Sequence, residues 1–93
     1  MVVGYGTILI RLFGVNSLKE KRSIVRGIVN ELKKRFEVSA IEAGRQDSKD
    51  YIMIGIAFAT LYEKDAESKF DNIEYFIESI HTIEDFSYDF HHF

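Results

Sequence analysis

The chain contains no cysteine among its 93 residues. Without thiols it can form neither disulfides nor thiolate zinc sites, and it has no cysteine nucleophile. It also lacks a long hydrophobic run, because the apolar start over residues 1–10 is interrupted by Gly4 and Gly6 and is followed by Arg11. Such a segment is too short and too broken for a signal peptide or a membrane span. We therefore predict a cytoplasmic protein with no membrane partner.

The sequence does contain enough apolar material for one hydrophobic core. Hydrophobic residues make up 46% of the chain and aromatic residues 14%. Because a chain this short rarely forms two cores, we predict a single domain over residues 1–93. The formal net charge is only −3, but residues 1–49 hold ten of the twelve Lys and Arg and five of the fifteen acids. Residues 50–93 are therefore strongly acidic.

Hydrophobic periodicity predicts six elements in the order β-α-β-β-α-β. Ser17 and Glu20 form a capping box, in which the Ser17 hydroxyl accepts a hydrogen bond from the Glu20 amide and the Glu20 carboxylate returns to the Ser17 amide. The predicted elements are a strand over 2–13, a helix from the capping box to about residue 35, strands over 38–43 and 51–60, a helix over 63–80 and a strand over 82–93. With right-handed crossovers, this order predicts an α+β, ferredoxin-like βαββαβ sandwich with a four-stranded antiparallel sheet and two helices on one face.

Each predicted helix carries charges of one sign on one flank of its apolar face. On the first helix, a wheel at about 100° per residue places four cations together, which we call the basic stripe: Lys19, Arg22, Arg26 and Lys33. The second helix carries five acids in the same way, which we call the acidic stripe: Glu63, Glu67, Asp71, Glu74 and Glu78.

The handedness of the crossovers predicts that these two stripes point away from each other. The opposite flanks of the helices carry Ile24 and Ile28 on the first helix and Phe76 on the second. These apolar residues are expected in the seam between the helices, with Arg35 near Asp65. One edge of the molecule would then be basic and the other acidic.

The segment Ser17-Leu18-Lys19-Glu20-Lys21-Arg22, followed by Ile24-Val25-Arg26, resembles the start of the first helix in the YlxP-like family. These are small uncharacterised bacterial proteins with a ferredoxin-like fold. The resemblance covers nearly the whole chain and includes Glu42, Gln46-Asp47 and Gly55. Where that family tends to have a histidine before Gln-Asp and an aromatic residue after it, this chain has Arg45 and Lys49.

The YlxP-like family has no established activity, but its members are often discussed beside ribosome-maturation and translation factors. The resemblance therefore implies RNA or the ribosome as a partner by association only. The basic stripe of Lys19, Arg22, Arg26 and Lys33 is the surface that we expect to bind RNA. The alternative is that the stripe is a solvated helix face, which is common in small proteins.

A second hypothesis needs no nucleic acid. If the helices cover Ile8, Ile10 and Leu12, the residues of the other parity face outward, among them Tyr5, Leu9 and Phe13. An exposed apolar patch usually marks an interface. The protein is then a homo-oligomeric scaffold or regulatory domain, a homodimer for example, that associates through its open sheet face.

Nothing in the sequence points to catalysis, a metal or a cofactor. Glu42, Asp47 and Asp50 lie near the predicted hairpin, but the sequence supplies no partner that would prepare them for acid–base chemistry. His91 and His92 are neighbours on a predicted strand, so their side chains point to opposite faces. We therefore predict no enzymatic activity and no metal site.

Overall fold

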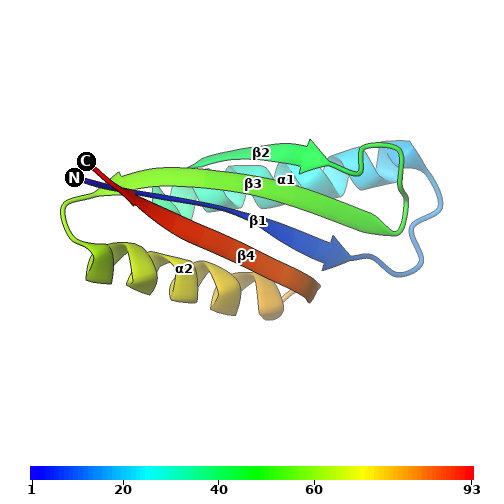
Figure 1. Cartoon of the computed structure of the whole chain (residues 1–93). Helices are drawn as coiled ribbons and strands as arrows, with labels where there is room; N and C mark the ends of the chain where they lie inside the picture. Colours follow the sequence, from blue (N-terminus) through cyan, green and yellow to red (C-terminus); the bar gives the residue numbers. More distant parts are fainter.

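The computed structural model describes all 93 residues and has the predicted order of elements. The elements are β1 (Val2–Arg11), α1 (Leu18–Phe36), β2 (Ser39–Gly44), β3 (Tyr51–Thr60), α2 (Glu63–Glu78) and β4 (Thr82–His92). The four strands form one antiparallel sheet in the order β2-β3-β1-β4, and both helices cover the same face of it (Figure 1). The predicted ferredoxin-like α+β fold is confirmed.

Two elements, β1 and α2, end two residues earlier than the periodicity predicts. β1 ends at Arg11 because its partner strand β3 begins at Tyr51, the residue opposite Arg11 in the ladder. Phe13 therefore lies beyond the strand, not within it. α2 ends at Glu78, so Ile80 lies outside the helix, in the short turn that leads into β4.

The capping box forms at the start of α1, with one change of partner. The Ser17 Oγ atom accepts a hydrogen bond from the Glu20 amide at 3.1 Å, as predicted. The Glu20 carboxylate accepts from the amide of Asn16 at 3.1 Å, and not from Ser17. Two amide donors at the helix start therefore still have acceptors, but the Glu20 carboxylate bonds the amide of the residue before Ser17.

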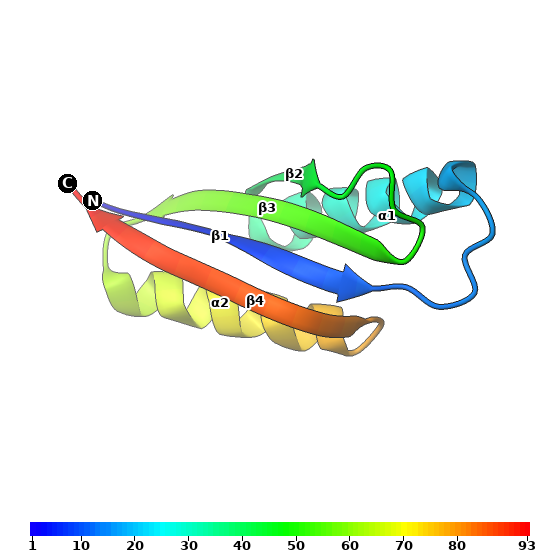
Figure 2. The same cartoon turned by 45° about the vertical axis from the view of Figure 1, so that its right-hand side comes forward.

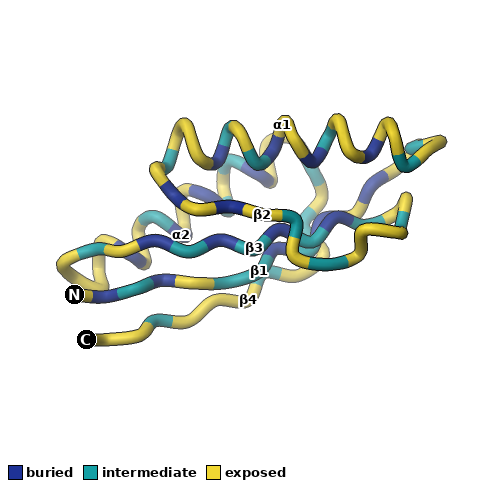
Figure 3. Tube along the Cα trace, turned by 90° about the horizontal axis from the view of Figure 1, so that it is seen from above, coloured by how far each residue is buried: buried dark blue, intermediate teal, exposed yellow.

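The core lies between the sheet and the two helices. Alternate residues of the central strands are fully buried on this side, as in Ile8 and Ile10 of β1 and Ile52 and Ile54 of β3. The alternation is visible along the strands in Figure 3. Because a strand has a side-chain period of two, the intervening residues form an open face that no helix covers.

The edge strand β4 is joined to the core through aromatic packing. Tyr88 stacks on Phe70 of α2, with ring centroids 4.2 Å apart and an interplanar angle of 16°. Gly6 of β1 makes this possible, because a Cβ atom there would lie 2.7 Å from the Cβ atom of Tyr88 and 2.5 Å from the carbonyl oxygen of Ser87. The whole molecule is elongated, 43 × 22 × 22 Å, with both chain termini at one end (Figure 1).

Candidate functional site

The basic stripe lies on the outer flank of α1. Lys19, Arg22, Arg26 and Lys33 are all exposed. None of their side chains forms a hydrogen bond or an ion pair with another residue of the chain. The side of α1 that packs into the core is a different one and carries Val25, Ile28 and Leu32. The four cations therefore face solvent with no carboxylate to neutralise them.

The seam between the helices has the predicted composition. Ile24 and Ile28 of α1 and Phe76 and Ile77 of α2 line a shallow hollow between the two helices. The helices lie side by side on the covered face of the sheet, as Figure 2 shows. Because the apolar flanks meet here, the basic stripe of α1 faces away from α2, which confirms the handedness argument.

Arg35 lies near Asp65, as predicted, but its charge is paired elsewhere. It lines the same hollow as Asp65, at the far end of the helices, but the two form no ion pair. Its Nε atom instead donates to Glu31 Oε2 at 2.6 Å, and its guanidinium group lies 4.6 Å from the centre of the Phe76 ring. The nearby guanidinium group lowers the pKa of Glu31 through their hydrogen bond.

The acidic stripe lies on the outer flank of α2. Its residues Glu63, Glu67, Asp71 and Glu78 are exposed and Glu74 is half-buried. Within the stripe only Glu63 has a partner, since its Oε1 atom lies 2.8 Å from Nε2 of His92. The protein therefore carries a basic flank with no internal ion pair and an acidic flank paired only at Glu63, on opposite sides of its helical layer.

A buried lysine lies beneath the basic stripe, and the sequence analysis did not identify it. Lys21 is 1% exposed, and its ammonium group donates to the carbonyl oxygen of Arg45 at 2.5 Å. Its Nζ atom lies 3.5 Å from Oε2 of Glu42, which is 22% exposed. Lys21 therefore attaches the hairpin between β2 and β3 to the first turn of α1.

This contact gives Glu42 a charged partner that the sequence analysis did not identify. The sequence did hold a signal, because Lys21 lies four residues before Val25 and seven before Ile28, on the stripe that α1 buries. A lysine at such a position requires a buried acceptor or carboxylate. The fixed partners of Lys21 assign it a structural role rather than a place in the exposed stripe.

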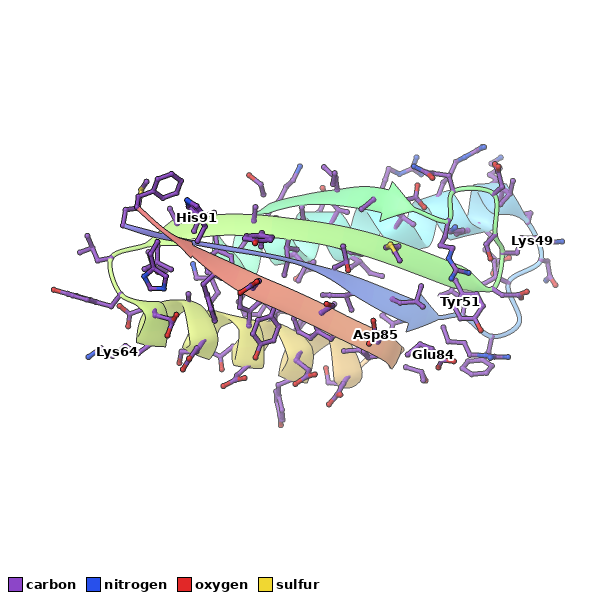
Figure 4. All side chains as sticks on the ribbon, in the orientation of Figure 1. Lys49, Tyr51, Lys64, Glu84, Asp85 and His91 are labelled. Carbon is purple, nitrogen blue, oxygen red and sulfur yellow. The ribbon has the colours of Figure 1, made fainter.

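Two arginine side chains pack against the ring of Tyr51 beside the hairpin turn. Arg45 has a left-handed backbone with φ 58°, and its guanidinium group lies 5.2 Å from the centre of the Tyr51 ring. Arg11 approaches the same ring at 5.6 Å and donates to the Tyr51 hydroxyl at 3.1 Å. Tyr51 and Lys49 lie at the end of the sheet remote from the termini (Figure 4).

The open sheet face carries two of the three residues predicted for self-association. Tyr5 is 45% exposed and Leu9 is half-buried on the same face of β1, as the parity predicts. Phe13 is exposed but lies past the end of β1, where the Arg11 guanidinium group is 5.4 Å from the centre of its ring. Beside Tyr5, the side chain of Ile41 and the bare backbone of Gly55 border an apolar hollow of about 320 Å³.

Other reactive groups are scattered. No three His, Cys, Asp or Glu side chains are arranged to hold a metal ion. His81 lines the hollow at the end of the helical seam, and burial lowers its pKa. Asp47 and Asp50 are exposed in and beside the hairpin turn, with no shared partner. Neither helix has the length and apolarity needed to cross a membrane.

Comparison with known proteins gives a relationship along nearly the whole chain. The family model described as "Protein of unknown function (DUF503)" matches residues 3–90. The uncharacterized protein YlxP of Bacillus subtilis (strain 168) is 29% identical over 83 residues, which cover 89% of this chain and 90% of that protein.

Proposed function

This chain belongs to the DUF503 family of proteins of unknown function, and we propose that it is a cytoplasmic protein that binds structured RNA, with ribosomal RNA as the first candidate. The basic stripe on α1 is the binding surface. Lys19, Arg22, Arg26 and Lys33 contact phosphates, and the interaction requires no catalysis and no cofactor.

One observation carries this proposal. Four exposed cations share one helix flank, and none has a carboxylate partner in the chain. In a protein of net charge −3, cations kept apart from the available acids are suited to an external anion. From Lys19 to Lys33 the stripe runs about 21 Å along the helix, at 1.5 Å per residue, which is long enough to follow several phosphates.

The stripe favours phosphates over bases. Lysine and arginine on an exposed helix flank meet the backbone of an A-form duplex, because its major groove is too deep and narrow for side chains to read. The sheet offers a poorer surface for stacking, since Tyr51 is already held between two guanidinium groups. Binding should therefore depend weakly on RNA sequence and strongly on salt.

The test is a salt series with ribosomal RNA fragments. Four phosphate contacts predict a slope of log affinity against log salt of roughly −3 to −4. Changing all four stripe residues to glutamine should remove most of this slope, and each single change should reduce it by about one. Circular dichroism verifies that each variant is folded.

A matched control separates the stripe from the overall charge. Lys34, Lys49 and Lys64 are exposed, lie outside the stripe and form no ion pair. The variant with these three changed to glutamine should bind like the parent, whereas the triple variant Arg22→Gln, Arg26→Gln, Lys33→Gln loses affinity. Equal losses in both triple variants contradict a localised binding surface.

The open sheet face supports a second candidate function, self-association as a scaffold. The supporting observation is the apolar hollow beside Gly55, with the exposed side chains of Tyr5 and Ile41 next to it. If the open face is the interface, a lysine in place of Leu9 adds a charge to this face without entering the core, so it should leave the fold intact and give a monomer. If the parent protein sediments as a monomer at high concentration, this candidate fails.

A further inference from the structure

Both edges of the sheet are free to pair with another strand. The order β2-β3-β1-β4 leaves one side of β2 and one side of β4 without a hydrogen-bonded neighbour. An unpaired edge presents a row of amide and carbonyl groups to any chain that can match it. Natural proteins usually protect such edges with lysine, proline or inward-pointing charges.

The β2 edge has little of this protection. Its sequence, Ser39-Ala40-Ile41-Glu42-Ala43-Gly44, contains no lysine and no proline. Its only charged side chain, Glu42, is paired with the buried Lys21. Ile41 is 63% exposed on the open face. Its protective features are its short length of six residues, an irregularity after Glu42, and the inward-pointing Glu42 itself.

The strand directions fit a continuous sheet made from two copies. β2 and β4 both run antiparallel to their own neighbours, so that β1 and β2 share one direction and β3 and β4 share the other. A second copy placed beside the first in the same orientation brings its β2 against β4 as an antiparallel pair. The helices of both copies then lie on one face, with α2 of the first beside α1 of the second.

The ladder alignments give which residues of the two edges lie at the same level across the sheet. Through β3 and β1, Ala40 lies at the level of Tyr88, and Ile41 at the level of Ser87. Tyr88 is partly exposed because nothing lies beyond the β4 edge. In the continued sheet Tyr88 would lie beside Ala40 of the next copy, whose side chain is already buried in its own core, so the contact there is made by the backbone.

Charge selects this arrangement over its alternatives. Continuation of the sheet from β4 to β2 places the acidic stripe of one copy beside the basic stripe of the next. Pairing β2 with β2 would instead bring the two basic stripes together, and pairing β4 with β4 would bring the two acidic stripes together. Like charges side by side are destabilising, so both of these symmetric modes are disfavoured.

We infer that copies of this protein associate edge to edge, with β4 of one copy pairing with β2 of the next and the acidic stripe on α2 facing the basic stripe on α1. The contact is head-to-tail, so it leaves one free edge of each kind and gives either a closed ring or a growing chain. Because surface ion pairs are individually weak and are screened by salt, the association is reversible and strongest at low ionic strength.

Edge-to-edge association is distinct from RNA binding but is coupled to it. The next copy and RNA use the same basic stripe, so they compete. RNA binding should therefore dissociate the assembly, and a variant that cannot assemble through its acidic stripe should keep its full RNA affinity.

Sedimentation of charge-reversed variants tests the inference. The first variant has glutamate at the basic-stripe residues, and the second has lysine at the acidic-stripe residues Glu67, Asp71, Glu74 and Glu78. Each variant alone should remain at the monomer mass of 10.8 kDa, because both of its helix flanks then carry one sign. An equimolar mixture of the two should associate, since each flank of one variant again meets its opposite on the other.

The parent protein and a sheet-face variant supply the controls. The parent, freed of nucleic acid, should exceed the monomer mass at low salt and return to it at high salt. Leu9→Lys should associate like the parent, because Leu9 lies on the open face and not at an edge. A parent that stays monomeric at low salt, or variants that associate equally well alone and mixed, would overturn the inference. Milder variants with glutamine and asparagine in place of the charges repeat the test with less risk to folding.

Amide hydrogen exchange gives an independent readout of the edges. In the associated parent, exchange should slow at amides of β2 and β4 relative to the protein at high salt, while the already paired β1 and β3 change little. Association without protection at either edge strand would rule out sheet continuation. The milder variant with glutamine and asparagine at the acidic stripe retains the whole basic stripe and gains no new cation, so its RNA salt series tests the proposed function separately.

Discussion

The pair formed by Lys21 and Glu42 should respond unequally to removal of its two members. Lys21 is 1% exposed, whereas Glu42 is 22% exposed. If the ammonium group is removed, the remaining carboxylate can turn to water. If the carboxylate is removed, the ammonium group stays buried with only the Arg45 carbonyl as partner. The loss of Glu42 should therefore destabilise the protein more than the loss of Lys21.

The magnitudes follow from the contacts. Lys21→Met keeps the length of the side chain and loses one charge-assisted hydrogen bond, which should cost about 1–3 kcal/mol. Glu42→Leu leaves a buried charge without its counter-ion, a change that costs about 3–5 kcal/mol in fully buried pairs. Because Glu42 is partly exposed, about 2–4 kcal/mol is expected here.

The double variant makes the prediction specific. An apolar pair often replaces a buried ion pair without loss, so Lys21→Met with Glu42→Leu should be more stable than Glu42→Leu alone. Urea unfolding followed by circular dichroism and tyrosine fluorescence measures all four proteins. If the two single variants are equally stable, or if their effects add in the double variant, the ammonium and carboxylate groups are not coupled as we describe.

Three further predictions concern the frame that supports the site. Ser17→Ala removes the acceptor for the Glu20 amide and should lower the unfolding free energy by about 1 kcal/mol; an unchanged urea midpoint would contradict its capping role. Gly27→Ala meets no atom within 4 Å and should stabilise α1 by up to about 1 kcal/mol, whereas Gly6→Ala places its Cβ atom 2.5 Å from the Ser87 carbonyl oxygen and should destabilise the protein clearly. Burial lowers the pKa of His81, so the unfolded chain takes up the proton more readily. The contribution of His81 to stability is thus complete above its unfolded pKa of about 6.5 and is lost as the pH falls below it; His81→Gln should reduce this loss, and parallel pH profiles for the two proteins would refute the assignment.

Most features of the fold could be predicted from local sequence patterns. The order of the six elements, the Ser17 cap and the buried parity of Ile8 and Ile10 all depend on residues close in sequence. A helix repeats every 3.6 residues and a strand every two, so each element shows its buried face directly. The positions of the basic and acidic stripes needed only one rule more, the right-handed crossover, which fixes which helix flanks meet.

The tertiary structure decided the contacts that depend on where separate elements meet. Lys21 lies 24 residues from Arg45 and 21 from Glu42, and no local pattern joins the first turn of α1 to the hairpin after β2. The guanidinium group of Arg35 lies 4.6 Å from the centre of the Phe76 ring, a contact between α1 and α2 that only their packing sets. The sequence by itself therefore determined the elements, their faces and the separation of charge. Only packing between distant segments decided which of the charges are neutralised inside the protein and which remain available to a partner.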